Sequence, residues 1–309
     1  MNSITYSFII PHHNTPNLLQ RLIDTIPKRC DVEIVVVDDN SDEDKKANTV
    51  RADVKTIYID KHHTKGAGGA RNVGMDAATG KWFLFADADD LYKPNFIDVL
   101  DEYKDDDIDI LFFNVETVDN DSLEPIYEYR SAFHQRITNE YDGSKRSTDN
   151  LLYWGYGPWR KMLSASYVKK YNFRFEEVPV SNDSFFSLQT SHFARKWKLD
   201  KRILYSLALY RGSLTYSPIT PKKYKTYLSI LPRRAKLFDY IGHSEWNIKS
   251  PKGRWTQSCF RYIYSLFHKR MYLYSIKAFF YYITHFRKIR RESTYYVDVF
   301  KLKELICID

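Results

Sequence analysis

The chain has 309 residues, of which 43% are hydrophobic, so it is long enough for one large domain or for two ordinary domains. Its three cysteines, Cys30, Cys259 and Cys307, match neither a metal-binding spacing nor a disulfide framework, which excludes a disulfide-stabilised secreted scaffold and favours a reducing compartment. The net charge of +8 is unevenly distributed along the chain. Residues 218–309 contain 19 Lys and Arg and 6 Asp and Glu (+13), so residues 1–217 contain the remaining 28 Lys and Arg and 33 Asp and Glu (−5).

Strand and helix patterns alternate along the first half of the chain. Short β-rich runs occupy residues 4–10, 32–37, 54–59, 81–86 and 108–114. Helical patterns lie between them, and the first begins at Thr15-Pro16, a typical N-cap followed by proline in the first turn. Strands separated by helices predict an α/β fold, with a Rossmann-like, mostly parallel central sheet flanked by helices.

Polar clusters follow three of these strands at the point where each strand ends. They occupy residues 11–14 (PHHN), 38–41 (DDNS) and 87–90 (DADD). Ligands of parallel sheets bind outside the carboxyl ends of the strands. The sequence therefore predicts that the three clusters meet in one site at one edge of the sheet.

The aspartates of residues 87–90 directly follow a buried-strand pattern. Asp87 and Asp89 are two residues apart, so both can face one ion, and their hard oxygen ligands suit Mg²⁺ or Mn²⁺. A polar turn before the next helix is the alternative, because Asp is common in turns and caps. The position after a buried strand favours the metal, and we expect Asp90 to cap the turn toward Lys93-Pro94.

The other two clusters and the glycine-rich segment keep alternatives open. A carboxylate in residues 38–41 can accept the imide N–H of a uracil ring or begin the next helix, and both hypotheses are equally supported. KGAGGARN (65–72) is either a flexible loop or a turn that lets a ligand approach the backbone, and its spacing excludes a P-loop and GxGxxG. His12-His13 and His62-His63 lack partners at metal-ligand spacing, so we expect solvated loop histidines.

The second half has a less regular pattern. Residues 115–152 are polar and irregular, which predicts strands and loops, whereas residues 182–192 have a helical pattern and residues 203–210 a strand pattern. The segment after residue 218 is expected to be mostly helical. We therefore predict a catalytic domain over 1–217, divided into halves 1–114 and 115–217, and a helical, basic and aromatic extension over 218–309.

The N-terminal motifs follow one another as SFIIPHHN, VEIVVVDDNSD and GAGGARNVGMDAATGKWFLFADADD. In this order and spacing they resemble the nucleotide-binding half of family 2 glycosyltransferases, which have the glycosyltransferase-A fold. The resemblance covers about residues 5–100. It implies that Asp89 binds the metal ion on the donor's diphosphate and that Asp87 lies near the ribose or the metal. The remaining residues implied to bind the nucleotide-sugar here are Pro11, His12, Asn14, Asp39, Gly69, Arg71 and Ala88.

The acceptor half resembles the same family more loosely. In VSNDSFFSLQ (180–189), Asp183 matches the family's general base, although a helix N-cap is a serious local alternative, and Asn182 replaces the usual glutamate. In LYRGSLT (209–215), Arg211 matches a residue that approaches the diphosphate. Trp154, Tyr156 and Trp159 are either an apolar platform for the acceptor sugar or part of the core, and the two alternatives are equally supported.

The resemblance implies inverting transfer of a hexosyl or N-acetylhexosaminyl group by single displacement, from a nucleotide-sugar, with UDP favoured, to a glycan acceptor hydroxyl. Many family members build bacterial surface polysaccharide (capsule, O-antigen or exopolysaccharide) on lipid-linked acceptors. A nucleotidyltransferase is an alternative, against which PHHN after the first strand counts. A non-catalytic membrane- or nucleic-acid-binding module is another, against which the intact Asp87, Asp89 and Asp183 count.

The basic extension has three candidate environments: nucleic acid, solvent or an anionic membrane. Residues 260–291 mix aromatic side chains with Lys and Arg, a composition typical of an interfacial helix, so we expect a membrane surface rather than nucleic acid. The N-terminus has no signal-peptide pattern, and no window approaches ~20 uncharged apolar residues. The sequence therefore predicts a cytoplasmic protein, peripheral on the inner face of the cell membrane.

Overall fold

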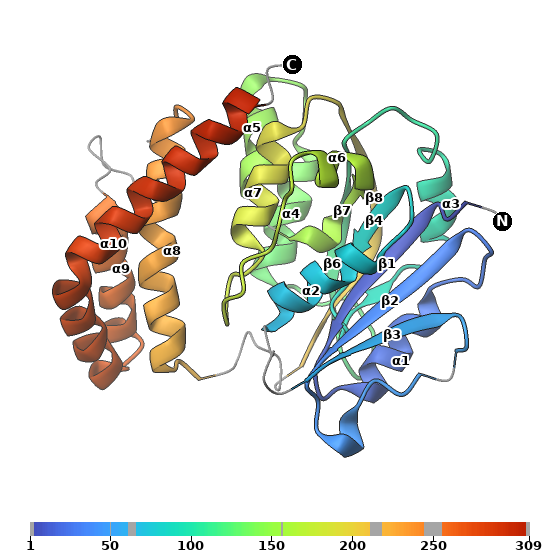
Figure 1. Ribbon diagram of the computed structural model, residues 1–309, viewed down its shortest axis with the longest axis horizontal. Helices are drawn as coiled ribbons and strands as arrows, with labels where there is room; N and C mark the ends of the chain where they lie inside the picture. Colours follow the sequence, from blue (N-terminus) through green and yellow to red (C-terminus); the bar gives the residue numbers. More distant parts are fainter. Residues whose placement is uncertain are drawn as a thin grey trace. The chain divides into compact units, whose positions relative to one another are not determined.

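The computed structural model describes residues 3–49, 51–60, 66–155, 157–210, 218–243 and 255–306. The chain forms two compact units (Figure 1). One contains Met1–Glu177 and Asn182–Leu214, and the other contains Val178–Ser181 and Thr215–Asp309. The division into a catalytic domain over 1–217, with halves 1–114 and 115–217, and an extension over 218–309 stays a prediction.

One mixed sheet dominates the first unit, and the expected central parallel strands are present. Its strand order is β3 (Val54–Ile59), β2 (Val32–Asp39), β1 (Tyr6–His12), β4 (Trp82–Phe85), β7 (Lys161–Ser164), β6 (Ile110–Asp119), β8 (Trp197–Leu209) and β5 (Leu91–Tyr92). The first four strands run parallel, as do β6 and β8, whereas β7 and β5 are antiparallel to their neighbours. The short strands β5 and β7 were not predicted.

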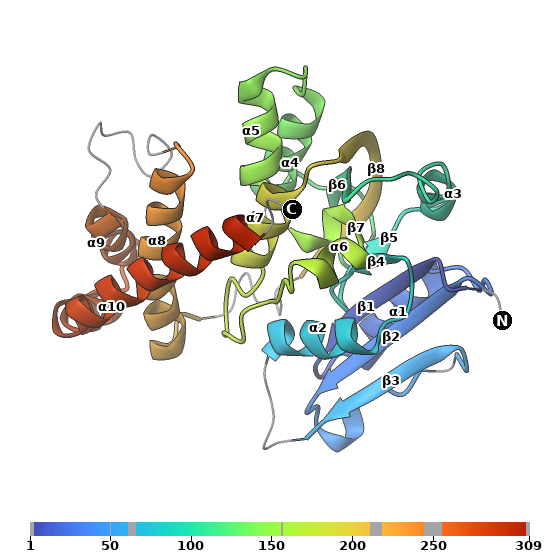
Figure 2. The ribbon, with the colours of Figure 1, turned by 45° about the horizontal axis from the view of Figure 1, so that its top comes forward.

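Alternation along β1 decides which helix covers which face of the sheet. Phe8 and Ile10 point into the cluster that also contains Leu22 of α1 (Pro16–Thr25). Ile9 points to the other face, where it meets Gly74 of α2 (Gly66–Ala77). Figures 1 and 2 show α1 and α2 on opposite faces of the β1–β2 region. The sheet is therefore covered on both sides, as its continuous apolar strands require.

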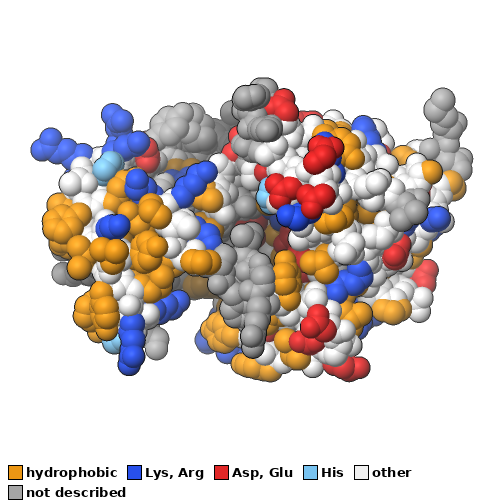
Figure 3. Space-filling view, turned by 90° about the horizontal axis from the view of Figure 1, so that it is seen from below, with side chains coloured by type: hydrophobic (Ala, Val, Ile, Leu, Met, Phe, Trp, Pro, Cys, Tyr) orange, Lys and Arg blue, Asp and Glu red, His pale blue; other side chains and the backbone are white. Residues whose placement is uncertain are grey.

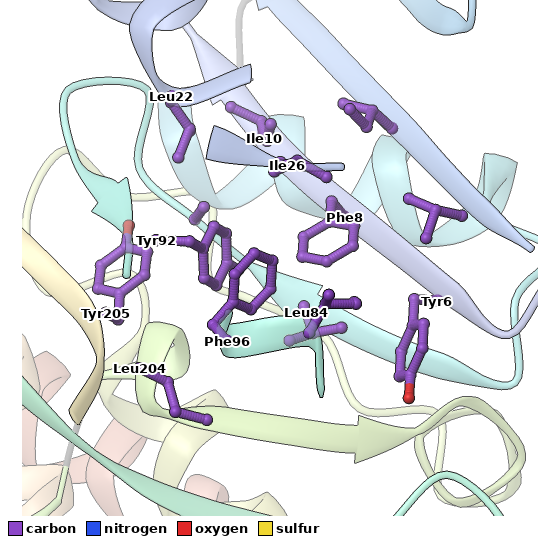
Figure 4. Packing of buried hydrophobic residues seen from close by; sticks show 14 of the residues in the cluster. Tyr6, Phe8, Ile10, Leu22, Ile26, Leu84, Tyr92, Phe96, Leu204 and Tyr205 are labelled. Carbon is purple, nitrogen blue, oxygen red and sulfur yellow. The ribbon is translucent and has the colours of Figure 1, made fainter. Parts of the chain in front are cut away.

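Aromatic side chains fill the core beneath α1 and α3 (Phe96–Asp101) (Figure 4). The rings of Tyr92 and Phe96 stack with centroids 4.2 Å apart, and Phe8 meets Tyr92 edge-on at 5.3 Å. Tyr205 of β8 extends the group to the other part of the sheet. This core fixes the positions of β1, β4 and the turn that follows β4.

The prediction of strands and loops for residues 115–152 was correct for the end of β6 and the connecting loops but wrong where helices form. Strand β6 continues to Asp119, and two helices follow, α4 (Tyr129–Asn139) and α5 (Lys145–Trp154). The buried face of α4 is largely polar: Ser131, His134 and Thr138 are buried there with Ile137. An apolar repeat therefore does not reveal this helix. The remaining short helices are η1 (Glu43–Lys45), η2 (Pro158–Arg160), α6 (Ala165–Lys170) and α7 (Ser184–Phe193).

The second unit is helical, as expected for the basic extension. It contains α8 (Pro221–Tyr240), α9 (Trp255–His268) and α10 (Tyr272–Ile306), which pack side by side (Figure 1). Their shared core contains Leu228 of α8, Cys259 and Ile263 of α9 and Tyr282 of α10. None of the helices in the described ranges is both long and apolar enough to cross a membrane.

Candidate active site

The ends of β1, β2 and β4 meet at one edge of the sheet, as expected from the polar clusters. These three strands are parallel neighbours, and His12 lies opposite Asp38 in the register of β1 and β2. Carboxyl ends of adjacent parallel strands face the same side of a sheet. Residues 11–14, 38–41 and 87–90 therefore converge.

The His12 side chain is buried, so the expectation of a solvated loop histidine was wrong for this residue. Its Nε2 accepts a hydrogen bond from the Thr15 N–H at 3.1 Å, so Nδ1 carries the proton and donates it to Asp38 at 2.9 Å. Burial lowers the pKa of His12, which favours this neutral form. The imidazole thus stabilises the strand ends, and a nucleotide contact at this position would fall to the backbone.

Asp38 organises the loop that follows β2. Its carboxylate accepts hydrogen bonds from the N–H groups of Ser41 and Ala47, both at 2.8 Å, in addition to the bond from His12. Burial alone would raise the pKa of Asp38, but these donors lower it overall. Asp38 was not among the predicted site residues, because the resemblance assigned the second aspartate of the pair, Asp39, to the nucleotide base.

Asn14 joins the loop after β1 to the loop after β2. Its N–H donates to Ser41 Oγ at 2.9 Å, and its side-chain oxygen accepts from the Asp42 N–H at 2.8 Å. Pro11 lies within β1 opposite Val37. Both residues thus lie at the converging edge, where the resemblance assigned them to the nucleotide base.

Asp39 fastens the start of α2 to the end of β2. Its Oδ2 accepts a hydrogen bond from the Gly66 N–H at 2.8 Å, and Gly66 has a left-handed backbone (φ 68°) that favours glycine. The helix begins at Gly66 itself, so residues 68 and 69 are helical rather than part of a turn. The carboxylate is buried at this junction.

Gly68 is required by the protein's own packing. A Cβ atom at this position would lie 2.0 Å from the Glu176 carbonyl oxygen and 3.0 Å from Asn182 Cβ. The neighbouring Gly69 is also buried. The glycines therefore bring α2 close to the segment that leads to Asp183. Neither alternative of the sequence analysis, a flexible loop or a turn for ligand approach, included this internal contact.

Arg71 connects three parts of this site. Its Nη1 donates to Asn182 Oδ1 at 2.9 Å, and its Nη2 forms an ion pair with Asp87. The guanidinium also lies over the Phe175 ring at 5.2 Å. The Arg71 side chain is buried. Asn182, which replaces the expected glutamate, therefore helps to hold the guanidinium in place.

Asp90 is structural, but not in the way expected. Its carboxylate accepts hydrogen bonds from the Tyr205 hydroxyl and from the Ala208 N–H, both at 2.9 Å. Tyr205 in turn accepts a hydrogen bond from the Asp87 N–H at 2.9 Å. The expected cap toward Lys93-Pro94 was therefore wrong, and Asp90 instead ties the turn after β4 to β8.

Asp89 presents the opposite situation. Within the described ranges, no other residue forms a hydrogen bond or an ion pair with its carboxylate, whereas its carbonyl oxygen accepts a bond from Arg21 at 2.8 Å. Burial, followed by the neighbouring Asp87 charge, raises the pKa of Asp89 to about 6. Ala88 lies buried between the two aspartates.

These residues fit a divalent ion that is shared with a substrate. No group of three or more potential ligand side chains occurs in the part of the chain that the structure describes. Mg²⁺ and Mn²⁺ are commonly held by one or two carboxylates together with substrate phosphates and water. A cation beside Asp89 would relieve the unfavourable charge that its raised pKa reflects, so the donor set suits either ion.

Asp183 lies directly before α7 and is half-buried. Its side chain makes no hydrogen bond that caps this helix, so the local alternative proposed for it is not realised. Burial raises the pKa of Asp183, and the nearby Arg71 charge opposes that shift. Lys161, which the sequence analysis missed, donates from Nζ to Ser187 O and Ser191 Oγ, both at 3.0 Å, and so holds the first turns of α7.

The predicted acceptor residues do not form one visible group. Trp159 packs against the core, with its ring parallel to that of Tyr205 at 6.1 Å, which favours the core alternative. Trp154, at the end of α5, meets Phe133 edge-on at 6.4 Å. Tyr156 and Arg211 lie outside the described residues.

Comparison with known proteins adds independent information. The family model described as "Glycosyl transferase family 2" matches residues 7–170. "Putative glycosyltransferase EpsH" of Bacillus subtilis is 23% identical over 230 residues, which cover 69% of this chain and 63% of that protein. "UDP-Glc:alpha-D-GlcNAc-diphosphoundecaprenol beta-1,3-glucosyltransferase WfgD" of Escherichia coli is 25% identical over 127 residues, 40% of this chain and 50% of that protein. The matches thus span less than two thirds of these relatives' own length.

Solved structures show the same fold. The crystal structure of S. aureus TarS 1-349 in complex with UDP-GlcNAc is 17% identical and superposes with a TM-score of 0.57, over 84% of this chain and 81% of that chain. A structure of the same protein with UDP gives a TM-score of 0.53 over 75% and 65%. The predicted glycosyltransferase-A fold is therefore confirmed.

Proposed function

The chain belongs to glycosyl transferase family 2, and from this premise we propose that it transfers a hexosyl or N-acetylhexosaminyl group from a UDP-sugar to a hydroxyl of a glycan acceptor, with inversion. The observation that carries the proposal is electrostatic. Arg71 and Asp87 each act on the pKa of both Asp89 and Asp183. The candidate metal ligand and the candidate base thus share the same charged neighbours.

Asp183 is the proposed general base. Its carboxylate takes the proton of the acceptor hydroxyl while that oxygen attacks the anomeric carbon and the bond to the diphosphate breaks. A raised pKa makes a carboxylate a stronger base for this transfer. The lack of a capping hydrogen bond supports the assignment, because it leaves the oxygens available to an acceptor.

Asp89 is the proposed metal ligand, and Asp87 and Arg71 maintain its surroundings. A bound Mn²⁺ or Mg²⁺ would supply positive charge to the leaving diphosphate. Asp87 is held by the ion pair with Arg71 and by its N–H bond to Tyr205, so it keeps the turn in position. Arg211 is proposed to approach the diphosphate, and Pro11, Asn14 and Asp39 to bind the base.

The acceptor is proposed to be lipid-linked, in the synthesis of a bacterial surface polysaccharide. Support comes from the names of relatives, such as the E. coli protein above and the "GalNAc(5)-diNAcBac-PP-undecaprenol beta-1,3-glucosyltransferase" of Campylobacter jejuni, 36% identical over 90 residues. UDP is supported by the two similar structures of S. aureus TarS, which are complexes with UDP and with UDP-GlcNAc. Such an acceptor would place the enzyme at the cytoplasmic face of a membrane.

A screen of nucleotide-sugars with Mn²⁺ tests the proposal. We expect release of UDP from one UDP-sugar when a suitable acceptor is present, and loss of that release in Asp89→Ala and in Asp183→Asn. Asp98→Asn, an exposed aspartate in the first turn of α3, is the matched control and should retain activity. Release that persists in both site variants would refute the assigned roles. Turnover of no donor by the wild type would favour a non-catalytic binding module.

A further inference from the structure

The first half of α10 has an exposed face that is apolar. Six large side chains on it are 41–62% exposed: Tyr272, Leu273, Ile276, Phe279, Phe280 and Ile283. Their spacing of three, four and seven residues places them along one side of the helix. We call these six residues the apolar stripe, and two exposed residues of α9, Tyr264 and Phe267, add to it.

The helical unit does not need the apolar stripe for its own core. A different side of α10 supplies that core through Ala278, Tyr282 and Ile289, which are buried against α8 and α9. This part of α10 is thus apolar on two sides, one of which packs inside the unit. Clusters of exposed apolar residues of this kind mark interaction sites.

The charge around the apolar stripe has one sign. Residues 255–291 contain eight Lys and Arg and no Asp or Glu. Lys269 and Arg270 form the turn before α10, Lys277 lies beside the stripe, and Arg287 and Arg291 continue α10 beyond Ile283. Within the described ranges, none of these five cations has an acidic partner. Lys288, a further cation of this segment, does have one, because its Nζ lies 3.8 Å from Glu292. Figure 3 shows hydrophobic side chains gathered over this unit, with Lys and Arg beside them.

We propose that this face of α9 and α10 binds the surface of an anionic lipid bilayer, with the apolar stripe at the depth of the headgroups and α10 parallel to the surface. Aromatic and aliphatic side chains beside Lys and Arg are the composition that interfacial helices use. Each Lys or Arg near an anionic membrane strengthens binding about fivefold. The inference deepens the proposed function, and the biological purpose of membrane binding rests on that function. Lipid binding itself does not require sugar transfer.

Two other occupants fit less well. A second copy of the chain, related by twofold symmetry, would bring the same cationic residues face to face, where they repel. A nucleic acid would attract the cations but leave the apolar stripe in water. Only an anionic bilayer satisfies the charge and the apolar surface together.

Flotation of the full-length protein with vesicles tests this proposal. We expect at least tenfold tighter binding to phosphatidylcholine vesicles that contain phosphatidylglycerol than to pure phosphatidylcholine, and weaker binding as salt increases. The variant Ile276→Ser with Phe280→Ser should lose at least tenfold in affinity, because both side chains enter the headgroup region. Tyr127→Ser, which changes an 83% exposed side chain in the other unit, should bind as the wild type does.

Two double charge reversals test whether anionic lipid is recognised by this surface or only by the net charge of the protein. Lys277→Glu with Arg287→Glu should abolish most of the preference for anionic vesicles, whereas Lys55→Glu with Arg146→Glu alters net charge equally and should not. Equal loss in both pairs would overturn the proposed surface. Binding of the Ile276→Ser and Phe280→Ser variant at wild-type strength would also overturn it. The same holds if that variant changes only from a dimer to a monomer and still binds vesicles as the wild type does.

Folding and catalysis serve as separate readouts for these variants. The four changed residues of the surface are exposed, so thermal unfolding monitored by circular dichroism should match the wild type. UDP release with a soluble acceptor should also be unchanged. If release is absent in every protein but vesicle binding behaves as expected, the proposed transfer fails while the membrane surface stands.

Discussion

Asp89 and Asp90 are adjacent in the chain, yet the protein surrounds their carboxylates in opposite ways. Asp90 is buried and accepts hydrogen bonds from Tyr205 and Ala208, so its position is determined by β8. Asp89 receives no such bond from the described residues, and burial with the Asp87 charge raises its pKa to about 6. An ionised Asp89 therefore destabilises the folded protein unless a cation binds.

This difference leads to a stability prediction for Asp89→Asn. The folded-state pKa of about 6 lies above the unfolded value near 3.9, so the folded state binds more protons between these values and wild-type stability falls as pH rises through that window. Without metal, we expect Asp89→Asn to be more stable than the wild type by roughly 1–3 kcal/mol at pH 7 and no more stable at about pH 4. Urea unfolding at both pH values measures the difference.

The control for Asp89→Asn is Asp98→Asn, which changes an exposed residue and should leave the free energy of unfolding close to that of the wild type. Mn²⁺ with UDP should stabilise the wild type and not Asp89→Asn, because the variant loses the proposed ligand. An Asp89→Asn protein that is less stable than the wild type at pH 7 would contradict the charge argument.

Asp183 leads to a prediction about the pH dependence of transfer. A base must be ionised, and burial raises the pKa of Asp183, so kcat/KM should fall as pH drops through a value above the usual range of aspartate. Asp183→Asn should lower kcat by about 10²–10⁴ while UDP binding is retained. Calorimetry of UDP binding with a pH series of initial rates tests both parts. A decrease in UDP affinity that matches the decrease in rate would argue for a structural role.

At the scale of single elements, Gly68 couples α2 to the segment before α7. Gly68→Ala places a Cβ atom 2.0 Å from the Glu176 carbonyl oxygen, so the helix and residues 176–182 must separate. We expect a loss of about 2–3 kcal/mol in the free energy of unfolding, together with a lower rate of transfer because Asp183 follows this segment. Denaturant unfolding and initial rates give the two values.

Gly143→Ala provides the contrast for this prediction. Gly143 also resists substitution, because its φ is 81°, but a Cβ atom there meets no atom within 4 Å. Its cost of about 1–2 kcal/mol is confined to the backbone of one turn, and transfer should be unchanged. If the two variants lose activity equally, the packing of α2 is not what positions Asp183.

The same scale shows what a sequence can and cannot predict. The parallel strands and α1 were predictable because apolar residues dominate their buried sides. Helix α4 was not, because its buried face depends on distant partners: Arg160 lies within hydrogen-bonding distance of His134 at 3.2 Å and donates to Thr138 at 2.8 Å, and Thr117 donates to Ser131 at 2.8 Å. Polar residues that become buried through tertiary hydrogen bonds carry no local signal.

Predicting the site faced the same limitation. The βα units predict parallel strands whose carboxyl ends share one edge of the sheet, so the convergence of residues 11–14, 38–41 and 87–90 could be expected. The resemblance separated Asp39 from Asp38 and Asp89 from Asp90. The partners that make Asp38 and Asp90 structural, such as His12 and Tyr205, could not be predicted, because only the tertiary structure brings them near. Spacing thus predicts where a site forms, and tertiary contacts decide which of its residues are structural.

At the scale of the whole molecule, each unit has its own hydrophobic cluster and its own charge. The cluster in the sheet contains buried residues between 6 and 205, and the helical cluster contains buried residues between 224 and 289. Their charges of −5 and +13 were evident from the sequence. Separate cores are the usual condition for separate folding.

Truncation after residue 217 tests whether the first unit folds and works alone. Because the described residues of its cluster, with Leu207 packed against them, all lie before residue 217, we expect a chain of residues 1–217 to unfold cooperatively and to bind UDP with Mn²⁺. Val178–Ser181 belong with the helical unit, however, and they directly precede Asn182 and Asp183. Truncation should therefore lower kcat with a soluble acceptor while the affinity for UDP stays close to that of the full chain.

Calorimetry, initial rates and vesicle flotation of both proteins distinguish these effects. Loss of UDP binding would show that the first unit is incomplete. Unchanged kcat would show that residues 178–181 do not depend on the helices.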